Sequence, residues 1–120
     1  MTYVLGIDIG SASVVATALS DHPNAPVRPV PLSSDGGETT PSTVYIARNG
    51  AFLLGRPAQL AVQTDPGGAV GDYLARVGDD VPIIAGGLAV AAHDIVAAVA
   101  RYAVDSGITA GASGPLHTAV

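Results

Sequence analysis

The chain has 120 residues, of which 48% are apolar and only 4% aromatic, and a formal net charge of −5 at pH 7. At this length it forms at most one domain of ordinary size, with a core made mainly of aliphatic side chains. All five basic residues are arginines. This argues against a nucleic-acid surface built from clustered Lys and Arg, and it rules out a Walker-type phosphate loop, which requires a lysine.

The sequence also bears on the cellular compartment. Cysteine is absent, so a disulfide framework and a thiolate zinc site are both excluded. The N-terminus lacks the basic and long apolar regions of a signal peptide. The most apolar stretch, residues 81–104, contains His93, Asp94 and Arg101, and a charge at mid-span costs about 2.5–3.5 kcal/mol on insertion scales. We therefore expect a buried helix rather than a membrane span, and a cytoplasmic protein with neither a membrane nor a nucleic acid as partner.

Two apolar runs at residues 3–9 and 13–19 predict neighbouring strands joined by a tight turn. Asp8 lies at the end of the first run, where its carboxylate would emerge from the sheet edge. Gly10 allows either a turn with positive φ or the close approach of a ligand. After it come three residues small enough to leave their backbone N–H groups open to an anion, Ser11, Ala12 and Ser13. We call residues 10–13 the elbow.

The elbow has two interpretations. Asp and Gly are ordinary hairpin residues, since an Asp side chain can close its own turn, and spacing alone favours this simple turn. A carboxylate beside open amides also suits a magnesium–phosphate group. In that arrangement Asp8 holds metal-bound water and the amides hold the phosphate oxygens.

Several further strands are expected. Residues 27–32 alternate apolar residues with Arg and Pro and predict an edge strand at best, because Pro cannot donate to a ladder. Residues 43–47 and 51–54 predict a hairpin that turns through Asn49-Gly50. Residues 116–120 resemble the start of another strand. Loops are expected at 20–26, 33–38 and 110–115.

Three helices are expected between these strands, which together indicate a mixed α/β sheet. Residues 56–64 carry Pro57 in the first turn and predict a short helix, and residues 69–77 predict another. Residues 88–105 predict the dominant helix, closed by Gly107 as a C-terminal cap, and residues 81–84 before it allow a short strand. The buried stripe of the dominant helix is expected to contain Leu88, Ala92, Ile95, Val99 and Tyr102.

Residues 6–13, Gly-Ile-Asp-Ile-Gly-Ser-Ala-Ser, resemble the first phosphate motif of the actin-like ATPases. They are most similar to the seventy-kilodalton heat-shock chaperones of the DnaK type, which carry Gly-Ile-Asp-Leu-Gly-Thr-Thr. Two further stretches lie in the order of that family. Residues 39–42 match its Thr-Thr-Pro-Ser, and residues 55–58 with Asp65-Pro66 resemble its Gly-x-Pro-Ala-Lys and Asn-Pro. The long helix and the strand near His117 correspond to the segment that leads into the family's central sheet.

This resemblance implies an incomplete actin-like, ribonuclease-H-like ATPase lobe. It implies a single partial domain over residues 1–120, with a shortened peripheral subdomain around residues 36–87. The chain would be the N-terminal fragment of a DnaK-like nucleotide-binding domain that binds Mg-ATP or ADP and couples it to conformational change. The residues implied are Asp8 beside the magnesium, Gly10, Ser11, Ala12 and Ser13 on the phosphates, and Gln59 in place of the family's catalytic Lys.

The rest of the family's machinery would lie beyond residue 120. It comprises the second phosphate loop, the adenine pocket and the peptide-binding domain, and contacts with client peptides or co-chaperones would come from there. A fragment of this kind, which lacks half of the nucleotide cleft, would not bind ATP tightly and would be inactive as an ATPase by itself. The sheet edge exposed at its C-terminal strand predicts self-association.

Departures from the family pattern keep a second interpretation open. Gln59 cannot neutralise charge on a transferring phosphoryl group as Lys does. The elbow loses the second family hydroxyl at Ala12, the family's later Lys-Arg pair becomes Leu74-Ala75, and its Arg before Thr-Thr-Pro-Ser becomes Glu38. The alternative is therefore a degenerate, non-hydrolysing actin-fold module that serves in binding or scaffolding. A third, less favoured class comprises other actin-like relatives such as cell-division or filament proteins.

Overall fold

A five-stranded mixed sheet carries the elbow. The computed structural model describes residues 3–20, 24, 26–33, 36–111, 115 and 117–120. The strands run in the order β10-β1-β2-β3, and β4 pairs with the same edge of β2 as β3 does, nearer the elbow. Among the described strands of this sheet, only the β1–β10 pair is parallel. The strand bounds are β1 (Tyr3–Ile9), β2 (Ser13–Ser20), β3 (Arg28–Pro29), β4 (Thr39–Pro41) and β10 (His117–Ala119).

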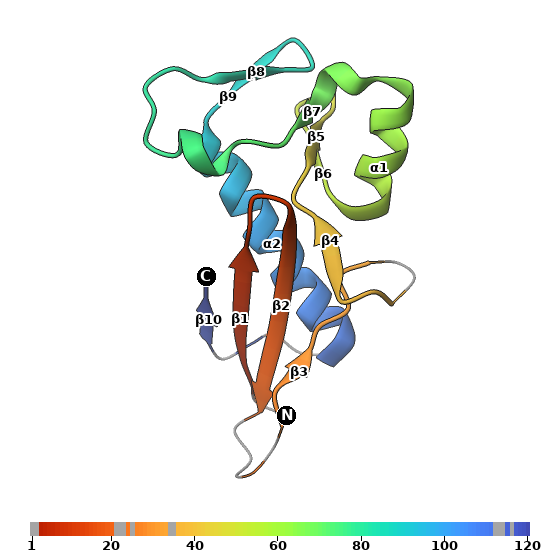
Figure 1. The fold of residues 1–120 in the computed structure, drawn as a ribbon, viewed down its shortest axis with the longest axis vertical. Coiled ribbons are helices and arrows are strands. Elements are labelled where there is room, and N and C mark those ends of the chain that lie inside the picture. The colour runs from red at the N-terminus through yellow and green to blue at the C-terminus, as the bar shows by residue number, and fades with distance from the viewer. Residues whose placement is uncertain (1–2, 21–23, 25, 34–35, 112–114, 116) are drawn as a thin grey trace.

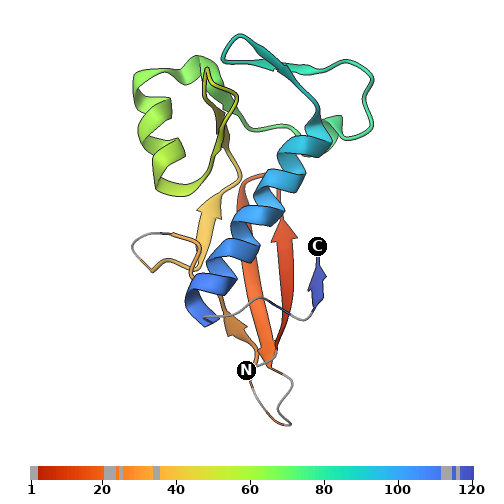
Figure 2. The ribbon, with the colours of Figure 1, turned by 180° about the vertical axis from the view of Figure 1, so that it is seen from behind.

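One long helix, α2 (Ala92–Gly111), covers one face of this sheet, and Figure 2 shows it crossing β1 and β2. Alternate side chains of β1 are buried on that face, beginning with Tyr3 and Leu5. Gly107 lets the helix approach closely, because a Cβ atom there would lie 3.3 Å from the Tyr3 hydroxyl and 3.6 Å from a Leu5 methyl. The buried residues of the helix are Ala92, Ile95, Val99, Ala103 and Gly107.

The segment between β4 and α2 forms a second group of elements, which Figure 1 shows beyond the elbow end of the main sheet. Its strands pair in the orders β6-β5-β7 and β8-β9. Both Gly86 and Gly87, at the turn of the β8–β9 hairpin, have positive φ. The elements are β5 (Val44–Ile46), β6 (Phe52–Leu53), α1 (Gly55–Thr64), η1 (Pro66–Gly68), β7 (Ala69–Val70), η2 (Leu74–Arg76), β8 (Ile83–Ala85) and β9 (Leu88–Val90).

Most of the expected elements are confirmed. The opening strands pair antiparallel along their whole length, and residues 43–47 and 51–54 form the β5–β6 hairpin around Asn49-Gly50. Helix α1 begins one residue before the expected start, and β8 begins two residues after the start of the expected short strand at 81–84 and ends one residue beyond it. The mixed α/β class is therefore confirmed.

Four expectations are wrong at particular places. Residues 69–77 form β7 and a single 3-10 turn instead of a helix. The expected long helix begins at Ala92, because residues 88–90 pair with β8 as β9. Gly107 lies inside that helix, packed against β1, and does not cap it. Residues 39–41, which contain a proline, form the strand β4, although no strand was expected there.

The remaining outcomes concern the edges of the molecule. The expected strand at 27–32 is reduced to the two residues of β3. Helix α2 extends to Gly111, so the first two residues of the loop expected at 110–115 are helical. Parts of the loops expected at 20–26, 33–38 and 110–115 lie outside the described residues. None of the helices in the described ranges combines the length and the apolar character that crossing a membrane requires.

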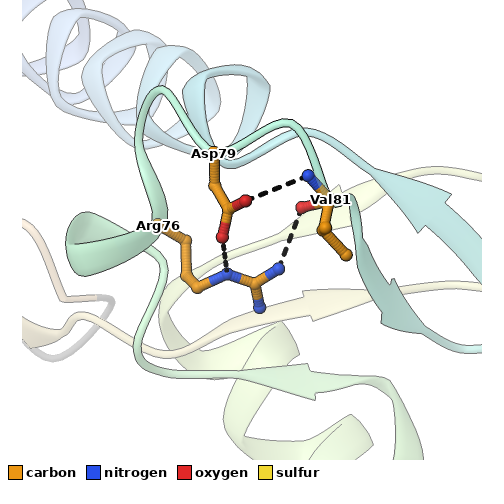
Figure 3. A network of polar contacts seen from close by, with 3 residues as sticks. All are labelled: Arg76, Asp79 and Val81. Carbon is orange, nitrogen blue, oxygen red and sulfur yellow. Dashed lines mark hydrogen bonds and ion pairs between the residues drawn. The ribbon is translucent and has the colours of Figure 1, made fainter.

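Asp79 organises the turn between η2 and β8, as Figure 3 shows. Its Oδ1 atom accepts a hydrogen bond of 3.0 Å from the Val81 amide, and its Oδ2 atom accepts one of 2.9 Å from Arg76 Nε. Arg76 Nη2 also donates to the Val81 carbonyl at 2.9 Å. Both charged side chains are more than a third exposed, so the ion pair itself contributes little.

The hydrogen bond from the Val81 amide, and then the one from Arg76, hold the pKa of Asp79 below its ordinary value. Because the pKa is lower in the folded state, this carboxylate stabilises the fold above its unfolded pKa. That stability is lost as the pH falls through the folded pKa. We expect Arg76→Gln to raise the Asp79 midpoint in an NMR titration, though not fully to its ordinary value. Arg101→Gln, an exposed control, should leave the midpoint unchanged; equal midpoints in all three proteins would contradict the assignment.

Thr40 provides a test of packing. Its side chain is 1% exposed, and its hydroxyl has no hydrogen-bond partner among the described residues. A buried polar group left unpaired costs roughly 1–3 kcal/mol. We expect Thr40→Val to raise the free energy of unfolding in urea by about 1 kcal/mol, whereas Thr39→Val, at the exposed neighbouring position, should change it little. A clear loss of stability in Thr40→Val would show that the hydroxyl is paired after all.

Candidate functional site

The elbow joins the antiparallel strands β1 and β2. The Gly10 amide donates a 2.9 Å hydrogen bond to the Ser13 carbonyl and closes the turn. Residues 11–13 are exposed. Within the part of the chain that the structure describes, the amides of Ser11 and Ala12 donate to no other group. The elbow therefore presents backbone donors to the solvent, as an anion site requires.

Gly10 is required by the tightness of the turn. Its φ lies outside the left-handed region, so the expectation of a positive φ is wrong. The physical reason is that the turn is closed by the hydrogen bond to Ser13 without a left-handed residue. A Cβ atom at Gly10 would lie 3.0 Å from the Ser13 carbonyl oxygen. Close approach within the chain is therefore what this glycine permits.

Asp8 lies on the face of the sheet opposite α2, because side chains alternate along β1. Its neighbours Ile7 and Ile9 point toward the core side, and its register partner on β2 is Val15. The carboxylate is exposed and has no hydrogen bond or ion pair within the described residues. It lines a shallow hollow of about 340 Å³ with Gly6, Ile7, Val15, Thr17, Ala119 and Val120.

This arrangement fits a magnesium ion that arrives with a nucleotide. No group of three or more potential metal ligands is found among the described residues, so the protein alone offers no complete cage. Mg²⁺ commonly keeps several waters and is held by one or two carboxylates together with substrate phosphates. A single unpaired carboxylate beside a turn with open amides suits that mode of binding.

Ser42 is a part of the site that local sequence patterns did not identify. It lies directly after β4, its side chain is 2% exposed, and its Oγ atom donates a 2.6 Å hydrogen bond to the Gly10 carbonyl. Its amide donates to the Ala12 carbonyl at 3.0 Å. The Tyr73 hydroxyl in turn donates to the Ser42 carbonyl at 2.6 Å. The only sequence signal for this residue is its place in the Thr-Thr-Pro-Ser match.

Gln59 lies on α1 with an exposed side chain. It borders a pocket of about 230 Å³ that separates α1 from the end of β4. Pro41 lines the same pocket and is the register partner of Ser13 at the elbow. Gln59 and the elbow therefore both adjoin Pro41. The other residues of the pocket are Thr43, Gly55, Ala58 and Val62.

The mixed sheet, the helix across one face and the exposed elbow at the end of β1 together have the architecture of a partial actin-like ATPase lobe. The resemblance to DnaK-type chaperones is confirmed by comparison with known proteins. A chaperone protein DnaK from Elusimicrobium minutum is 31% identical over 80 residues, which cover 67% of this chain and 13% of the relative.

Two more DnaK chaperones show the same similarity. The protein from Thermosipho melanesiensis is 37% identical over 65 residues, covering 52% of this chain and 10% of the relative. The protein from Endomicrobium trichonymphae is 26% identical over 78 residues, which cover 65% of this chain and 13% of the relative. The matched segments thus span only 10–13% of the length of these curated relatives. No protein-family model matches the chain.

The tightness of the elbow can be tested at Gly10. We expect Gly10→Ala to lower the free energy of unfolding by roughly 1–3 kcal/mol, because the added methyl group presses on the Ser13 carbonyl. Gly71→Ala is a matched control, since a Cβ atom there meets nothing within 4 Å and its φ is not left-handed. Urea denaturation of the three proteins measures the difference. Equal stability of the two variants would show that the turn relaxes without cost.

Proposed function

We propose that this chain binds Mg-ATP through Asp8 and the elbow, as the N-terminal part of a DnaK-like nucleotide-binding domain. The observation that carries the proposal is the exposed turn in which the Ser11 and Ala12 amides donate to no group among the described residues. Beside it stands the unpaired carboxylate of Asp8. The resemblance of residues 6–13 to the family's first phosphate motif supports the same assignment.

Each group would have a distinct role. The amides of the elbow, with the hydroxyls of Ser11 and Ser13, would donate hydrogen bonds to phosphate oxygens. Gly10 keeps the turn narrow enough for these donors to converge. Asp8 would accept hydrogen bonds from water molecules bound to magnesium. The metal ion would supply the positive charge that offsets the phosphates, since the chain has no lysine to do so.

Gln59 would occupy the catalytic place that the family gives to Lys. Its amide can hydrogen-bond a phosphate oxygen or a water molecule, but it carries no charge to stabilise the transferring group. We therefore propose that nucleotide binding is retained and that hydrolysis by this chain is slow or absent. Binding would be coupled to conformational change within a larger nucleotide-binding domain.

The broader assignments depend on the same resemblance. We propose that residues 1–120 form a single partial domain, in which residues around 36–87 are a shortened peripheral subdomain. Client peptides or co-chaperones would contact other regions of the protein. The uncovered edge of β10 would favour self-association, and the cytoplasm would be the compartment in which the protein works.

A non-hydrolysing binding or scaffolding module is the second candidate. Gln59 favours it, because a neutral side chain stands where the resemblance places the family's catalytic Lys. The two candidates differ in turnover and in nucleotide affinity. In a scaffold that has lost both nucleotide binding and hydrolysis, adding Mg-ATP would not shift the NMR signals of the elbow amides.

The first test is an NMR and calorimetric titration of Mg-ATP into the longest natural form of this protein and into its Asp8→Asn variant. We expect the amides of residues 10–13 to shift on binding, and Asp8→Asn to weaken the affinity by about tenfold or more, because hydrogen bonds to a charged group contribute roughly 1.5–3 kcal/mol. Removal of magnesium with EDTA should weaken binding of the unaltered protein in the same way.

Asp105→Asn serves as the control, since this exposed carboxylate lies on α2 far along the chain from the elbow. It should bind Mg-ATP as the unaltered protein does. Release of ADP from the same samples separates binding with turnover from binding alone. Absence of any shift at the elbow in the folded, unaltered protein would overturn the nucleotide assignment and leave the scaffold.

A further inference from the structure

A chain of hydrogen bonds connects the elbow to Tyr73, which lies 63 positions after Gly10 in the sequence. The Ser42 side chain and amide hold the Gly10 and Ala12 carbonyls at 2.6 and 3.0 Å, and the Tyr73 hydroxyl holds the Ser42 carbonyl at 2.6 Å. Ser42 is 2% exposed and Tyr73 is completely buried. The contact between Tyr73 and Ser42 is therefore shielded from competing water, and the contact between Ser42 and Gly10 is partly shielded.

The geometry of the peptide bond gives these contacts a consequence for ligand binding. The carbonyl of Gly10 and the N–H of Ser11 belong to one planar trans peptide unit, so they point in opposite directions. The carbonyl of Ala12 and the N–H of Ser13 are related in the same way. By holding the two carbonyls, Ser42 fixes the direction of both N–H groups, and of these the Ser11 N–H donates to no group among the described residues.

We propose that Ser42 is the positioning residue of the elbow, which orients the Ser11 amide toward phosphate and holds the Ala12–Ser13 peptide before any ligand binds, and that Tyr73 holds Ser42 in place. This inference rests on the proposed nucleotide site. The advantage is that ordering the donors in advance lowers the entropy lost on binding. The peptide between Ser11 and Ala12 has no such anchor, since the Ser11 carbonyl accepts no hydrogen bond from the described residues.

Tyr73 extends the link to the peripheral elements. It lies between β7 and η2, directly before the turn that leads to Asp79 and the β8–β9 hairpin. Burial raises the pKa of its phenol, and hydrogen bonding with Ser42 offsets part of that rise. The hydroxyl therefore stays protonated and able to donate at neutral pH. A shift of this segment would move Ser42 and, through it, the amides of the elbow.

The test compares Ser42→Ala and Tyr73→Phe with the unaltered protein. Without nucleotide, we expect the ¹⁵N order parameters of the Ser11 and Ser13 amides to fall in Ser42→Ala from values typical of rigid backbone, about 0.85, toward those of flexible backbone, below about 0.6. With Mg-ATP, we expect roughly three- to tenfold weaker binding. Tyr73→Phe should show the same changes to a smaller extent.

Ser106→Ala is the matched control, because it also removes a serine hydrogen bond to a backbone carbonyl, 2.9 Å long and on α2. It should change neither the order parameters nor the affinity. If Ser42→Ala does not fold, the same measurements on Tyr73→Phe still test the inference. That variant removes the hydrogen bond to the Ser42 carbonyl and keeps the Ser42 hydroxyl.

The outcomes separate this inference from the proposed function. Unchanged order parameters at Ser11 and Ser13 in both variants would overturn the positioning role, whether or not the protein binds nucleotide. Mobile amides with unaltered Mg-ATP affinity would overturn its contribution to binding. If the unaltered protein does not bind Mg-ATP, the proposed function fails, and with it the role of Ser42 in phosphate binding. In that case the order parameters still show whether Ser42 fixes the elbow.

Discussion

The alternation of side chains along β1 is the constraint on which both the core and the candidate site depend. Tyr3, Leu5 and Ile7 are buried on the side of α2. Because successive side chains of a strand point to opposite faces, Asp8 is directed to the open face as soon as its neighbours are buried. A shift of one residue in register would bury the carboxylate and expose the core. Packing of the helix thus determines on which face of the sheet the Asp8 carboxylate lies.

Much of this arrangement could be predicted because its signals are local. The alternation of β1 and the breakers at residues 10–13 give the opening hairpin, and Asn49-Gly50 gives the second hairpin. Elements that depend on distant partners were predicted wrongly or missed. β4 contains Pro41 and exists because it pairs with β2. Residues 88–90 continue the helical spacing of α2 in the sequence, yet they pair with β8, since two glycines with positive φ turn the chain back.

The candidate site divides in the same way. Asp8 and the elbow are adjacent in sequence, so their chemistry could be recognised from residue types and from resemblance to a phosphate motif. Ser42 acts on Gly10 from 32 positions away, and Tyr73 acts on Ser42 from 31 positions away. Neither contact produces a periodic pattern in the sequence from which it could be predicted. Gly107 shows the same limit: at a helix end it would be a cap, but here it is the point where α2 meets Tyr3.

The proposed site would also allow nucleotide binding and hydrolysis to diverge in one fold. Binding needs donors with fixed directions and a metal ligand, and the backbone of the elbow supplies the donors whatever the side chain at Ala12. Hydrolysis needs charge placed on the transferring group, which only a side chain or a metal ion can provide. Gln59, which borders the same pocket as Pro41, is neutral, and the chain has no lysine, so in the proposed site this charge would come from the metal ion. In the function proposed above, a substitution such as Gln59 would remove turnover first, while the hydrogen bonds of Ser42 would keep the shape of the elbow.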